Sequence, residues 1–227
     1  MVNNAAILVA GGTGTRMNAD VPKQFLLLSG MPVLMHSIGI FHRFDPELQL
    51  LVTLPENHIS MWEKLCLKHS FMIPHQIVRG GITRFHSVKN ALELIDGDGL
   101  VAIHDGVRPL VSGETLRRAF EEAGKNGNAV PVIRFNESIR KILDNGNISV
   151  ERENLRIVQT PQVFRKDLIK KAYSSAPHEN FTDDATVVET LGVALHLVEG
   201  NPENIKITRP SDLKFAEVIL GYSQSAD

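Results

Sequence analysis

A glycine-rich segment near the start of the chain carries the clearest chemical signal in the sequence. Three glycines within residues 11–14 follow the continuous apolar run of residues 5–10, which is typical of a parallel strand covered on both faces. Glycines leave backbone N–H groups unshielded by Cβ, so such a loop is able to wrap an anion closely. Two cations, Arg16 and Lys23, come next. This pattern predicts a binding loop for a polyphosphate.

The spacing of these residues excludes two common polyphosphate sites. The Walker pattern ends its loop in Gly-Lys-Ser/Thr, whereas Lys23 stands nine residues after Gly14. The dinucleotide fingerprint needs a third small residue where this chain has Met17. The remaining string, Gly-Gly-x-Gly-x-Arg-Met followed by Pro-Lys-Gln, resembles the signature of sugar-nucleotide nucleotidyltransferases. From the residues alone, the alternative is a strand-to-loop turn with two surface cations.

Two adjacent glycines follow a second apolar run. In open parallel sheets ligands bind at the carboxyl ends of the strands. We therefore expect polar and glycine residues that follow apolar runs to lie in one ligand site. Gly80 and Gly81 come just after residues 76–78. Because they lack side chains, their backbone groups are able to approach a flat base edge. This pair therefore predicts a base-binding turn.

A carboxylate and a cation follow a third run, residues 100–103. Asp105 is placed to help hold a metal–phosphate complex or a sugar hydroxyl, and Arg108 to meet a second phosphate. A structural ion pair between the two is the alternative. His104 is interpreted as a packed or orienting residue, because phosphoryl transfer to a phosphate oxygen needs no proton abstraction.

The elements that must position these residues alternate between strand and helix signals. Repeated β-then-α units predict an α/β fold in which a mostly parallel, twisted sheet is flanked by helices on both faces. We expect one domain over residues 1–227. The expected strands are residues 49–54, 76–78, 100–103 and 129–133 after the first run, and the expected helices begin at residues 32, 59, 84 and 112, the last with Ser112 as its cap.

One polar stretch, residues 135–156, interrupts this alternation. It carries the turn signal Asn145-Gly146 between two short alternating runs, which predicts a β-hairpin. Two strands with few apolar residues are only marginally stable alone. We therefore expect this hairpin to project as an arm and to pack on a second copy of the protein. A surface excursion with no partner is the alternative.

Composition limits the function classes. With 227 residues, 43% hydrophobic residues, 22% charged residues and a net charge of −2, the chain is typical of an ordinary globular protein. Such a charge argues against a nucleic-acid-binding surface spread over the whole molecule, and a local basic pocket is the alternative. The single Cys66 fits a reducing compartment and is interpreted as buried and structural. With no membrane-length apolar segment and no signal peptide in residues 1–4, we expect a cytoplasmic protein without membrane contact.

Seven motifs in order resemble one family, the 2-C-methyl-D-erythritol 4-phosphate cytidylyltransferases of the non-mevalonate isoprenoid pathway. Ribitol-5-phosphate cytidylyltransferases share most of these motifs. The resemblance spans residues 5 to about 220 and rests on residues 11–17, 22–24, 80–81, 104–109, 159–162, 182–185 and 204–208.

The resemblance implies a reaction and a set of site residues. CTP and methylerythritol phosphate would give the CDP-alcohol and pyrophosphate, with Mg²⁺ bridging the triphosphate. Arg16 and Lys23 would stabilise the transition state, and Arg152 and Lys206 would position the substrate phosphate. The implied CTP-binding residues are Ala10, Gly11, Gly12, Gly14, Thr15, Gly81, Ile82, Ser87 and Asp105. The implied substrate-binding residues are Asp105, Arg108, Ser138, Arg152 and Lys206, and Asp105 is a candidate metal ligand.

The resemblance also implies that the arm of residues 135–156 forms a homodimer and brings Ser138 and Arg152 into the neighbouring site. Alternation in residues 204–208 predicts a strand that sends Lys206 to the face opposite Ile205 and Ile207. Without the family context, Lys206 would be interpreted as a solvated lysine at a strand edge.

Two positions depart from the family pattern. The chain has Gly106-Val107 where the family usually has Ala-Ala or Ala-Val, and Glu137-Ser138 where it usually has Asp-Thr. These changes touch the region that separates methylerythritol from ribitol, so a cytidylyltransferase for another polyol phosphate is the alternative enzyme. A non-catalytic nucleotide-binding module is the alternative outside enzymes, and the presence of Arg16, Lys23 and Asp105 argues against it.

Overall fold

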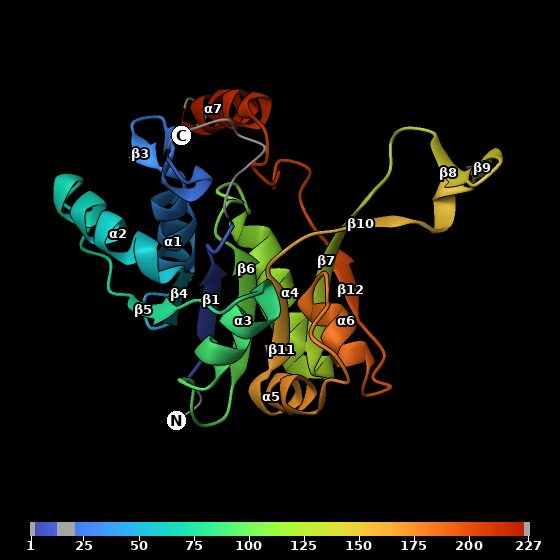
Figure 1. The fold of residues 1–227 in the computed structure, drawn as a ribbon, viewed down its shortest axis with the longest axis horizontal. Coiled ribbons are helices and arrows are strands. Elements are labelled where there is room, and N and C mark those ends of the chain that lie inside the picture. Colours follow the sequence, from blue (N-terminus) through green and yellow to red (C-terminus); the bar gives the residue numbers. More distant parts are fainter. Residues whose placement is uncertain (1–2, 13–20, 225–227) are drawn as a thin grey trace.

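The computed structural model describes residues 3–12 and 21–224, and its elements alternate between strand and helix along much of the chain (Figure 1). The strands are β1 (Ala5–Val9), β2 (Leu27–Leu28), β3 (Met31–Pro32), β4 (Gln49–Leu54), β5 (Gln76–Arg79), β6 (Leu100–Asp105), β7 (Asn128–Arg134), β8 (Ile139–Leu143), β9 (Gly146–Val150), β10 (Arg156–Val158), β11 (Gln162–Arg165) and β12 (Leu197–Glu199). The helices are α1 (Val33–Phe44), α2 (Glu56–Lys68), α3 (Arg84–Leu92), α4 (Gly113–Asn126), α5 (Lys166–Ser175), α6 (Asp184–Glu189) and α7 (Pro210–Gln224), with the short 3-10 helices η2 (Lys23–Phe25) and η3 (Arg152–Asn154).

Eight of these strands form one sheet, in the order β10-β7-β11-β6-β1-β4-β5, with β12 also paired to β7. Four pairs are parallel: β6 with β1, β1 with β4, β4 with β5, and β12 with β7. β11 is antiparallel to both β6 and β7, and β10 is antiparallel to β7. The predicted mostly parallel α/β sheet is confirmed, with two antiparallel strands that the sequence pattern did not predict.

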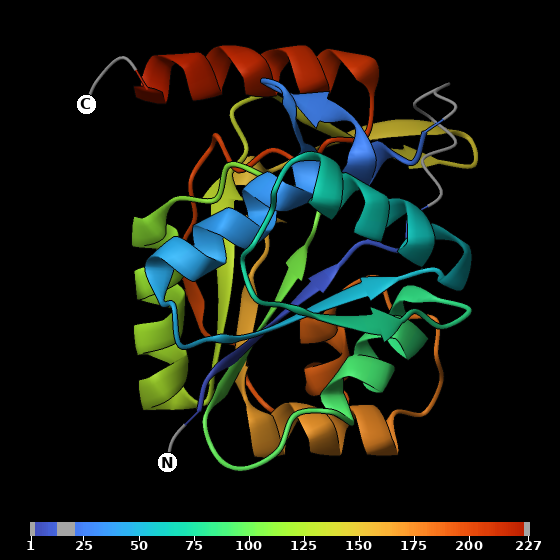
Figure 2. The ribbon, with the colours of Figure 1, turned by 90° about the vertical axis from the view of Figure 1, so that its left-hand side faces the viewer.

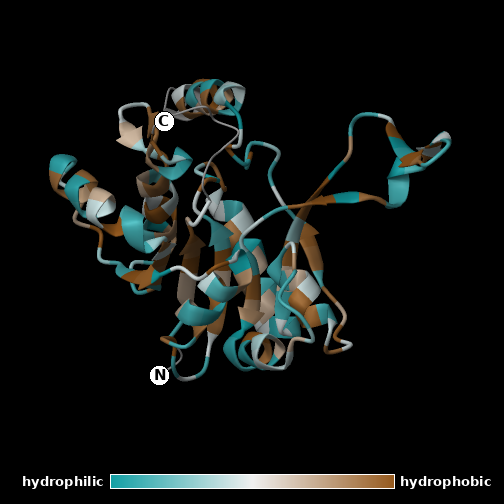
Figure 3. Cartoon of the chain, in the orientation of Figure 1, coloured by the Kyte–Doolittle hydropathy of each residue, from teal (hydrophilic) through white to brown (hydrophobic). Residues whose placement is uncertain are grey.

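Two hydrophobic cores lie on the two faces of this sheet. Successive residues of β1 point to opposite faces, so Ala6 and Leu8 enter one core while Ala5 and Ile7 enter the other. The first core packs against α1, α2 and α4, and the second against α3, α5 and α6. Figure 2 shows the sheet between these layers, and Figure 3 shows its central strands as apolar. Burial on both faces explains the uninterrupted apolar run of β1.

The predicted hairpin is confirmed. β8 pairs with β9 and with no other strand of the described chain, from Ile139 opposite Val150 to Leu143 opposite Gly146. The hairpin projects from the body of the molecule, beyond β7 and β10 (Figure 1). Gly146 has φ of +130°, a conformation that residues with a Cβ rarely adopt. The glycine of the Asn-Gly pair is therefore required by the turn.

Several expected elements differ from the structure, and β5 and β7 are each slightly longer than expected. α2 begins at Glu56 rather than residue 59, directly after Pro55, and β6 extends to include Asp105. Residues 204–208 are not a strand: the last strand of the described chain is β12, and the later segment is irregular. Among the described residues, none of the helices combines the length and the apolar composition that crossing a membrane requires.

Candidate active site

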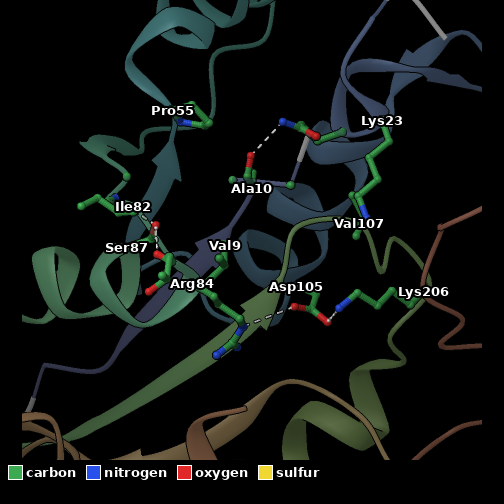
Figure 4. A pocket seen from close by; sticks show the side chains of 16 residues that line it. Val9, Ala10, Lys23, Pro55, Ile82, Arg84, Ser87, Asp105, Val107 and Lys206 are labelled. Atoms are coloured by element: carbon green, nitrogen blue, oxygen red, sulfur yellow. Dashed lines mark hydrogen bonds and ion pairs between the residues drawn. The ribbon is translucent and has the colours of Figure 1, made fainter. Parts of the chain in front are cut away.

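A cavity of about 240 Å³ opens where β1, β4, β5 and β6 end (Figure 4). It collects most of the predicted site residues that the structure describes. Ile82 and Ser87 lie to one side of Ala10, and Lys23 lies to the other, with Asp105 and Lys206 near one another. The lining is Val9, Ala10, Gly11, Gly12, Lys23, Gln24, Pro55, Gly80, Gly81, Ile82, Thr83, Arg84, Ser87, Asp105, Val107 and Lys206.

The glycine segment and Lys23 meet at this cavity. A Cβ built on Gly12 would lie 3.1 Å from Cε of Lys23, so the lysine stem lies directly over a position without a side chain. Gln24 is fully buried and its Nε2 donates a hydrogen bond to the carbonyl oxygen of Ala10, at 2.8 Å. This bond ties the turn that carries Lys23 to the end of β1. Gly14, Thr15 and Arg16 lie outside the described residues.

An aromatic contact supports the same turn from behind. Phe25, the last residue of η2, stacks on Trp62 of α2 with ring centroids 5.8 Å apart and an interplanar angle of 17°. Trp62 is fully buried, and its Nε1 donates to Nε2 of His75 at 2.9 Å. Lys23 therefore stands on a turn packed against the hydrophobic core rather than on a loose surface loop.

The predicted base-binding turn is held by its own hydrogen bonds. The N–H of Gly81 donates to Oγ of Ser87 at 3.0 Å, and the Ser87 hydroxyl donates to the carbonyl oxygen of Thr83 at 3.0 Å. A Cβ on Gly81 would lie 2.2 Å from Cβ of His86. The glycine is therefore required by packing against α3. Ile82 remains 95% exposed at the rim of the cavity, while the Ser87 hydroxyl shapes the turn.

Asp105 is nearly buried among three cations. Its Oδ2 lies 2.9 Å from Nζ of Lys206 and 3.3 Å from Nε of Arg108, and its Oδ1 lies 3.9 Å from Nε of Arg84. Burial alone would raise the pKa of Asp105, but Lys206, Arg84 and Arg108 together hold that pKa well below its usual range. The carboxylate is therefore ionised at neutral pH. The ion pair of Asp105 with Arg108, one of the two readings of the sequence, is present.

The segment that carries Lys206 corrects one prediction. The expected strand is absent, yet the alternation holds in part: Ile207 is buried, and Lys206 turns to Asp105. The segment is fixed by specific contacts instead of a ladder. The N–H of Ile207 donates to the carbonyl oxygen of Val107 at 2.9 Å. Nδ2 of the buried Asn204 donates to the carbonyl oxygen of Thr160 at 2.8 Å.

His104 is a packed residue, as expected. Its Nε2 lies 3.0 Å from the carbonyl oxygen of Arg108, which only accepts, so Nε2 carries the hydrogen. Its Nδ1 lies 3.0 Å from Oγ1 of Thr160, and that same Oγ1 accepts from the N–H of Asp105 at 3.1 Å. Complete burial lowers the pKa of His104 to about 4. The neutral ring thus braces the backbone on either side of Asp105.

The sequence interpretation missed a buried charge network behind the cavity. Nη1 and Nη2 of Arg84 donate to Oδ1 and Oδ2 of Asp184 at 2.8 and 2.6 Å. The hydroxyl of Tyr173 donates to Oδ1 of Asp184 at 2.7 Å. Burial by itself would lower the pKa of Arg84, but Asp184, Asp105 and Tyr173 together outweigh burial and raise that pKa above its usual range. Asp184 lies within the quoted motif at residues 182–185, which is the only signal that pointed to it.

A second cavity, of about 370 Å³, adjoins the first through shared residues. Arg84, Asp105 and Lys206 line both cavities. The second adds Arg108 and several side chains that bear hydroxyl, carboxylate or amide groups. They are Gln159, Thr160, Gln162, Thr182, Asp183 and Thr186, with Val158 as the apolar member.

The arm residues do not reach these cavities in the same chain. Neither Ser138 nor Arg152 lines either cavity. Nη1 of Arg152 instead donates to the carbonyl oxygen of Asn136, within the arm. Their predicted role requires a neighbouring molecule and stays a prediction.

These features define a class of protein. A glycine turn at the end of a central parallel strand, with Lys23 beside it and an ionised Asp105 facing cations, is the site of an α/β protein that handles nucleotide polyphosphates. The family model of IspD, 2-C-methyl-D-erythritol 4-phosphate cytidylyltransferase, matches residues 4–222, and the chain belongs to that family.

Individual relatives agree with this assignment. The chain is 51% identical over 215 residues to the 2-C-methyl-D-erythritol 4-phosphate cytidylyltransferase of Bacteroides fragilis, covering 95% of this chain and 98% of that one. It is 48% identical over 219 residues to that of Bacteroides thetaiotaomicron, covering 96% and 100%. The crystal structure of the Thermus thermophilus enzyme has a TM-score of 0.79 and 31% identity, covering 95% and 98%.

Proposed function

We propose that this protein transfers CMP from CTP to 2-C-methyl-D-erythritol 4-phosphate. The products are 4-diphosphocytidyl-2-C-methyl-D-erythritol and pyrophosphate, in non-mevalonate isoprenoid synthesis. Family membership over residues 4–222 supports the reaction. The observation that carries the proposal is the pair of cavities that share Asp105, Lys206 and Arg84, because a transfer between two phosphorylated molecules needs two adjoining sites with common cations.

The chemistry asks for positioning and charge neutralisation rather than proton transfer. An oxygen of the substrate phosphate forms the new bond to the α-phosphorus of CTP, and the bond from that phosphorus to the bridging oxygen of pyrophosphate breaks. The attacking phosphate is already an anion, so no base is needed. The protein must bring two anions together and stabilise the charge that grows on the departing pyrophosphate.

We assign the first cavity to CTP. The triphosphate would lie along the glycine segment that ends β1, with Lys23 beside it, and Arg16 belongs to the same proposal by its place in the motif. The cytosine would lie against the turn of Gly81 and Ile82, whose exposed backbone is held by Ser87. Ala10, Gly11 and Gly12 line the cavity between these two ends, and Gly14 and Thr15 extend the proposed loop.

We assign the second cavity to the polyol phosphate. Arg108 and Lys206 supply positive charge to this cavity, and the hydroxyl of Thr182 suits a polyol. Lys206 contacts Asp105 in the structure, so an incoming phosphate would share Lys206 with that carboxylate. Arg108 donates through Nη1 to the carbonyl oxygen of Asn204 at 2.7 Å, which fixes the direction of its guanidinium.

A divalent cation fits this site as a partner of the triphosphate. Asp105 is the only carboxylate among the described residues that line the first cavity, and the described residues contain no cluster of three or more potential metal ligands. Mg²⁺ commonly uses one or two carboxylates and the phosphates of its substrate. When bound, Mg²⁺ would neutralise phosphate charge, with Asp105 as its protein ligand.

We further propose that the arm of residues 135–156 forms a homodimer and delivers Ser138 and Arg152 to the second cavity of the neighbour. The projecting position of the hairpin supports this, as do the exposed apolar side chains Ile142 and Ile148. If Arg152 acts across the dimer, mixing Lys23→Ala and Arg152→Ala proteins should restore up to about a quarter of wild-type turnover after the subunits reassort. No recovery with confirmed mixed dimers would place Arg152 outside the neighbour's site.

The reaction is tested by pyrophosphate release from CTP and Mg²⁺, with methylerythritol 4-phosphate and ribitol 5-phosphate assayed in parallel. We expect strong preference for methylerythritol 4-phosphate. Preference for ribitol 5-phosphate would overturn the substrate assignment. Gly106 and Glu137 make this comparison necessary, because they depart from the family pattern in the region that separates the two substrates. Release with neither substrate would overturn the enzyme assignment.

The role of Lys23 is tested in the same assay. Lys23→Ala should lower turnover by about two orders of magnitude or more, by comparison with loss of one oxyanion donor, while calorimetry still detects CTP binding. Lys64→Ala is the matched control, since Lys64 is an exposed lysine of α2 that lines neither cavity. Normal turnover by Lys23→Ala would show that Lys23 does not stabilise the transition state.

A further inference from the structure

We propose that Asp184 is a positioning residue of this active site, which holds the guanidinium of Arg84 in place so that Asp105 stays available between the two cavities. This inference rests on the proposed transfer reaction. It adds a role for two residues, Arg84 and Asp184, that touch each other across 100 positions of sequence.

The carboxylate of Asp184 is held on every side. It is fully buried, it accepts both terminal nitrogens of Arg84, and it accepts the hydroxyl of Tyr173. Its backbone is fixed as well, because the N–H groups of Asp184 and Ala185 both donate to Oε1 of Gln162, at 3.0 and 2.8 Å. A buried, fully hydrogen-bonded carboxylate of this kind has one available orientation.

Arg84 is the group that this carboxylate places. Its two terminal nitrogens face Asp184, which leaves Nε on the side of Asp105, 3.9 Å from Oδ1. That distance is too long for a hydrogen bond but close enough for strong charge attraction at a nearly buried site. Arg84 also lines both cavities and begins α3, directly after the base-binding turn. Arg84 therefore lies at the boundary between the two proposed sites.

Two carboxylates compete for this one guanidinium, and Asp184 holds the bidentate contact. The guanidinium of Arg84 therefore lies near Asp105 without a hydrogen bond to it, and the close partners of Asp105 are Lys206 and Arg108. When a substrate phosphate shares Lys206, Arg84 still balances the charge of Asp105 without covering its oxygens. If Asp184 lost its charge, Arg84 would be free to form the bidentate pair with Asp105 instead. That pair would block the oxygens that the reaction needs.

The experiment compares Asp184→Asn with Tyr173→Phe. Asp184→Asn removes the charge and keeps the shape, whereas Tyr173→Phe removes one hydrogen bond to Asp184 and leaves both bonds to Arg84. For Asp184→Asn we expect kcat to fall by about tenfold or more, while the CTP dissociation constant, measured in EDTA so that Asp105 holds no Mg²⁺, stays within about threefold of the wild type. For Tyr173→Phe we expect a lower unfolding temperature with kcat within about twofold. A merely structural network would not produce this division.

Three results would overturn the proposal. They are an Asp184→Asn protein with kcat within about twofold of wild type, a Tyr173→Phe protein that loses as much kcat as Asp184→Asn, and an Asp184→Asn protein that loses CTP binding in EDTA in proportion to kcat. If Asp184→Asn does not fold, Arg84→Lys serves, because lysine keeps the charge but does not make a bidentate pair. Full activity of Arg84→Lys would overturn the proposal equally. A wild-type chain without turnover would refute the proposed function itself, which separates that failure from failure of the positioning role alone.

Discussion

His104 and Asp105 are neighbours in β6, yet at neutral pH His104 is uncharged and Asp105 is ionised. His104 contacts a carbonyl oxygen, a hydroxyl and the ring of Phe41, and its complete burial outweighs the nearby Asp105 charge and lowers its pKa to about 4. Asp105 faces Lys206, Arg84 and Arg108, which keep it ionised despite burial. One residue of the strand is therefore a neutral brace and the next is a fixed charge.

This contrast predicts how stability depends on pH. The pKa of His104 is about 4 in the folded chain and about 6.5 when unfolded. Between those values the unfolded state binds more protons, so the free energy of unfolding falls as the pH drops from 6.5 to 4. We expect this residue to contribute a loss of about 3 kcal/mol from neutral pH to pH 4. Asp105 changes the free energy of unfolding only at lower pH, because its pKa in the folded chain lies below its usual range.

Urea unfolding of the wild type and of His104→Gln at several pH values measures this contribution. The variant lacks the titrating ring but keeps a donor and an acceptor, and other histidines titrate equally in both proteins. The pH dependence should therefore be shallower in the variant between pH 6.5 and 4. Parallel curves for the two proteins would contradict the assignment.

Gly81 gives a second prediction at the scale of single residues. Because a Cβ there would lie 2.2 Å from Cβ of His86, Gly81→Ala must displace the turn from α3. We expect a loss of about 1–3 kcal/mol in the free energy of unfolding and CTP binding weaker by about tenfold or more, measured by urea unfolding and calorimetry. Gly113→Ala is the control: a Cβ there meets nothing within 4 Å. Equal effects of the two substitutions would contradict the packing argument.

Single residues also show where prediction from sequence ends. Asp105 follows an apolar run and precedes a glycine, and Lys23 belongs to the Pro-Lys-Gln string that follows the glycine segment, so local pattern marked both residues. The contact between Arg84 and Asp184 joins residues 100 positions apart, and no local period encodes such a contact. The motif containing Asp184 was recognisable, but its partner became visible only when α3 and α6 were placed on the same face of the sheet.

Helices α1 and α4 were predicted well, whereas strand β11 was not predicted. α1 and α4 begin directly after Pro32 and Ser112. Both helices have amphipathic spacing, and in α4 the Ser112 hydroxyl also accepts a capping hydrogen bond from the N–H of Thr115. β11 has four residues and runs antiparallel between β6 and β7, an arrangement that no two-residue period reveals. Residues 204–208 alternate like a strand but lack a ladder partner, so side-chain packing alone produced the pattern.

The hairpin turn supplies a prediction at the scale of elements. Gly146→Val forces a branched residue into φ of +130° and should disorder the turn. Because β8 and β9 pair only with each other among the described strands, the main sheet should stay intact. We expect the dimer dissociation constant, measured by sedimentation, to rise by about tenfold or more with little change in the main unfolding transition.

Gly97→Val is the matched control for the hairpin. Gly97 also has a positive φ, of +72°, and open space around it, but it lies far along the chain from the arm. It should carry a comparable local strain without weakening the dimer. Equal dimer affinity in both variants would show that the arm is not the interface.

At the scale of the whole molecule, the site lies at the carboxyl ends of the strands of a sheet that is packed on both faces. The cavity draws on the ends of β1, β4, β5 and β6 and on the irregular segment that carries Lys206. These parts come from positions 9 to 206 of the sequence, so the site exists only when the sheet is assembled. A ligand that bridges them should stabilise the whole fold.

That linkage predicts a metal-dependent shift in the unfolding temperature. At CTP concentrations about a hundred times the dissociation constant, binding adds about 2.7 kcal/mol to the free energy of unfolding. For a chain of this size we expect a rise of about 5–10 °C in Tm with Mg²⁺ present. Chelation with EDTA should remove most of this rise, because the triphosphate would then approach the cavity without its counter-ion. An identical rise in EDTA would show that the metal has no part in CTP binding.

The packing of Trp62 provides an optical probe of the site. It is the only tryptophan in the sequence, and it stacks on Phe25, in the same short helix as Lys23. All tryptophan fluorescence from the protein thus originates next to the turn proposed to hold the triphosphate. Each movement of that turn changes the surroundings of a single emitter, and a titration with unmodified nucleotide is read directly from the intrinsic emission of the native chain.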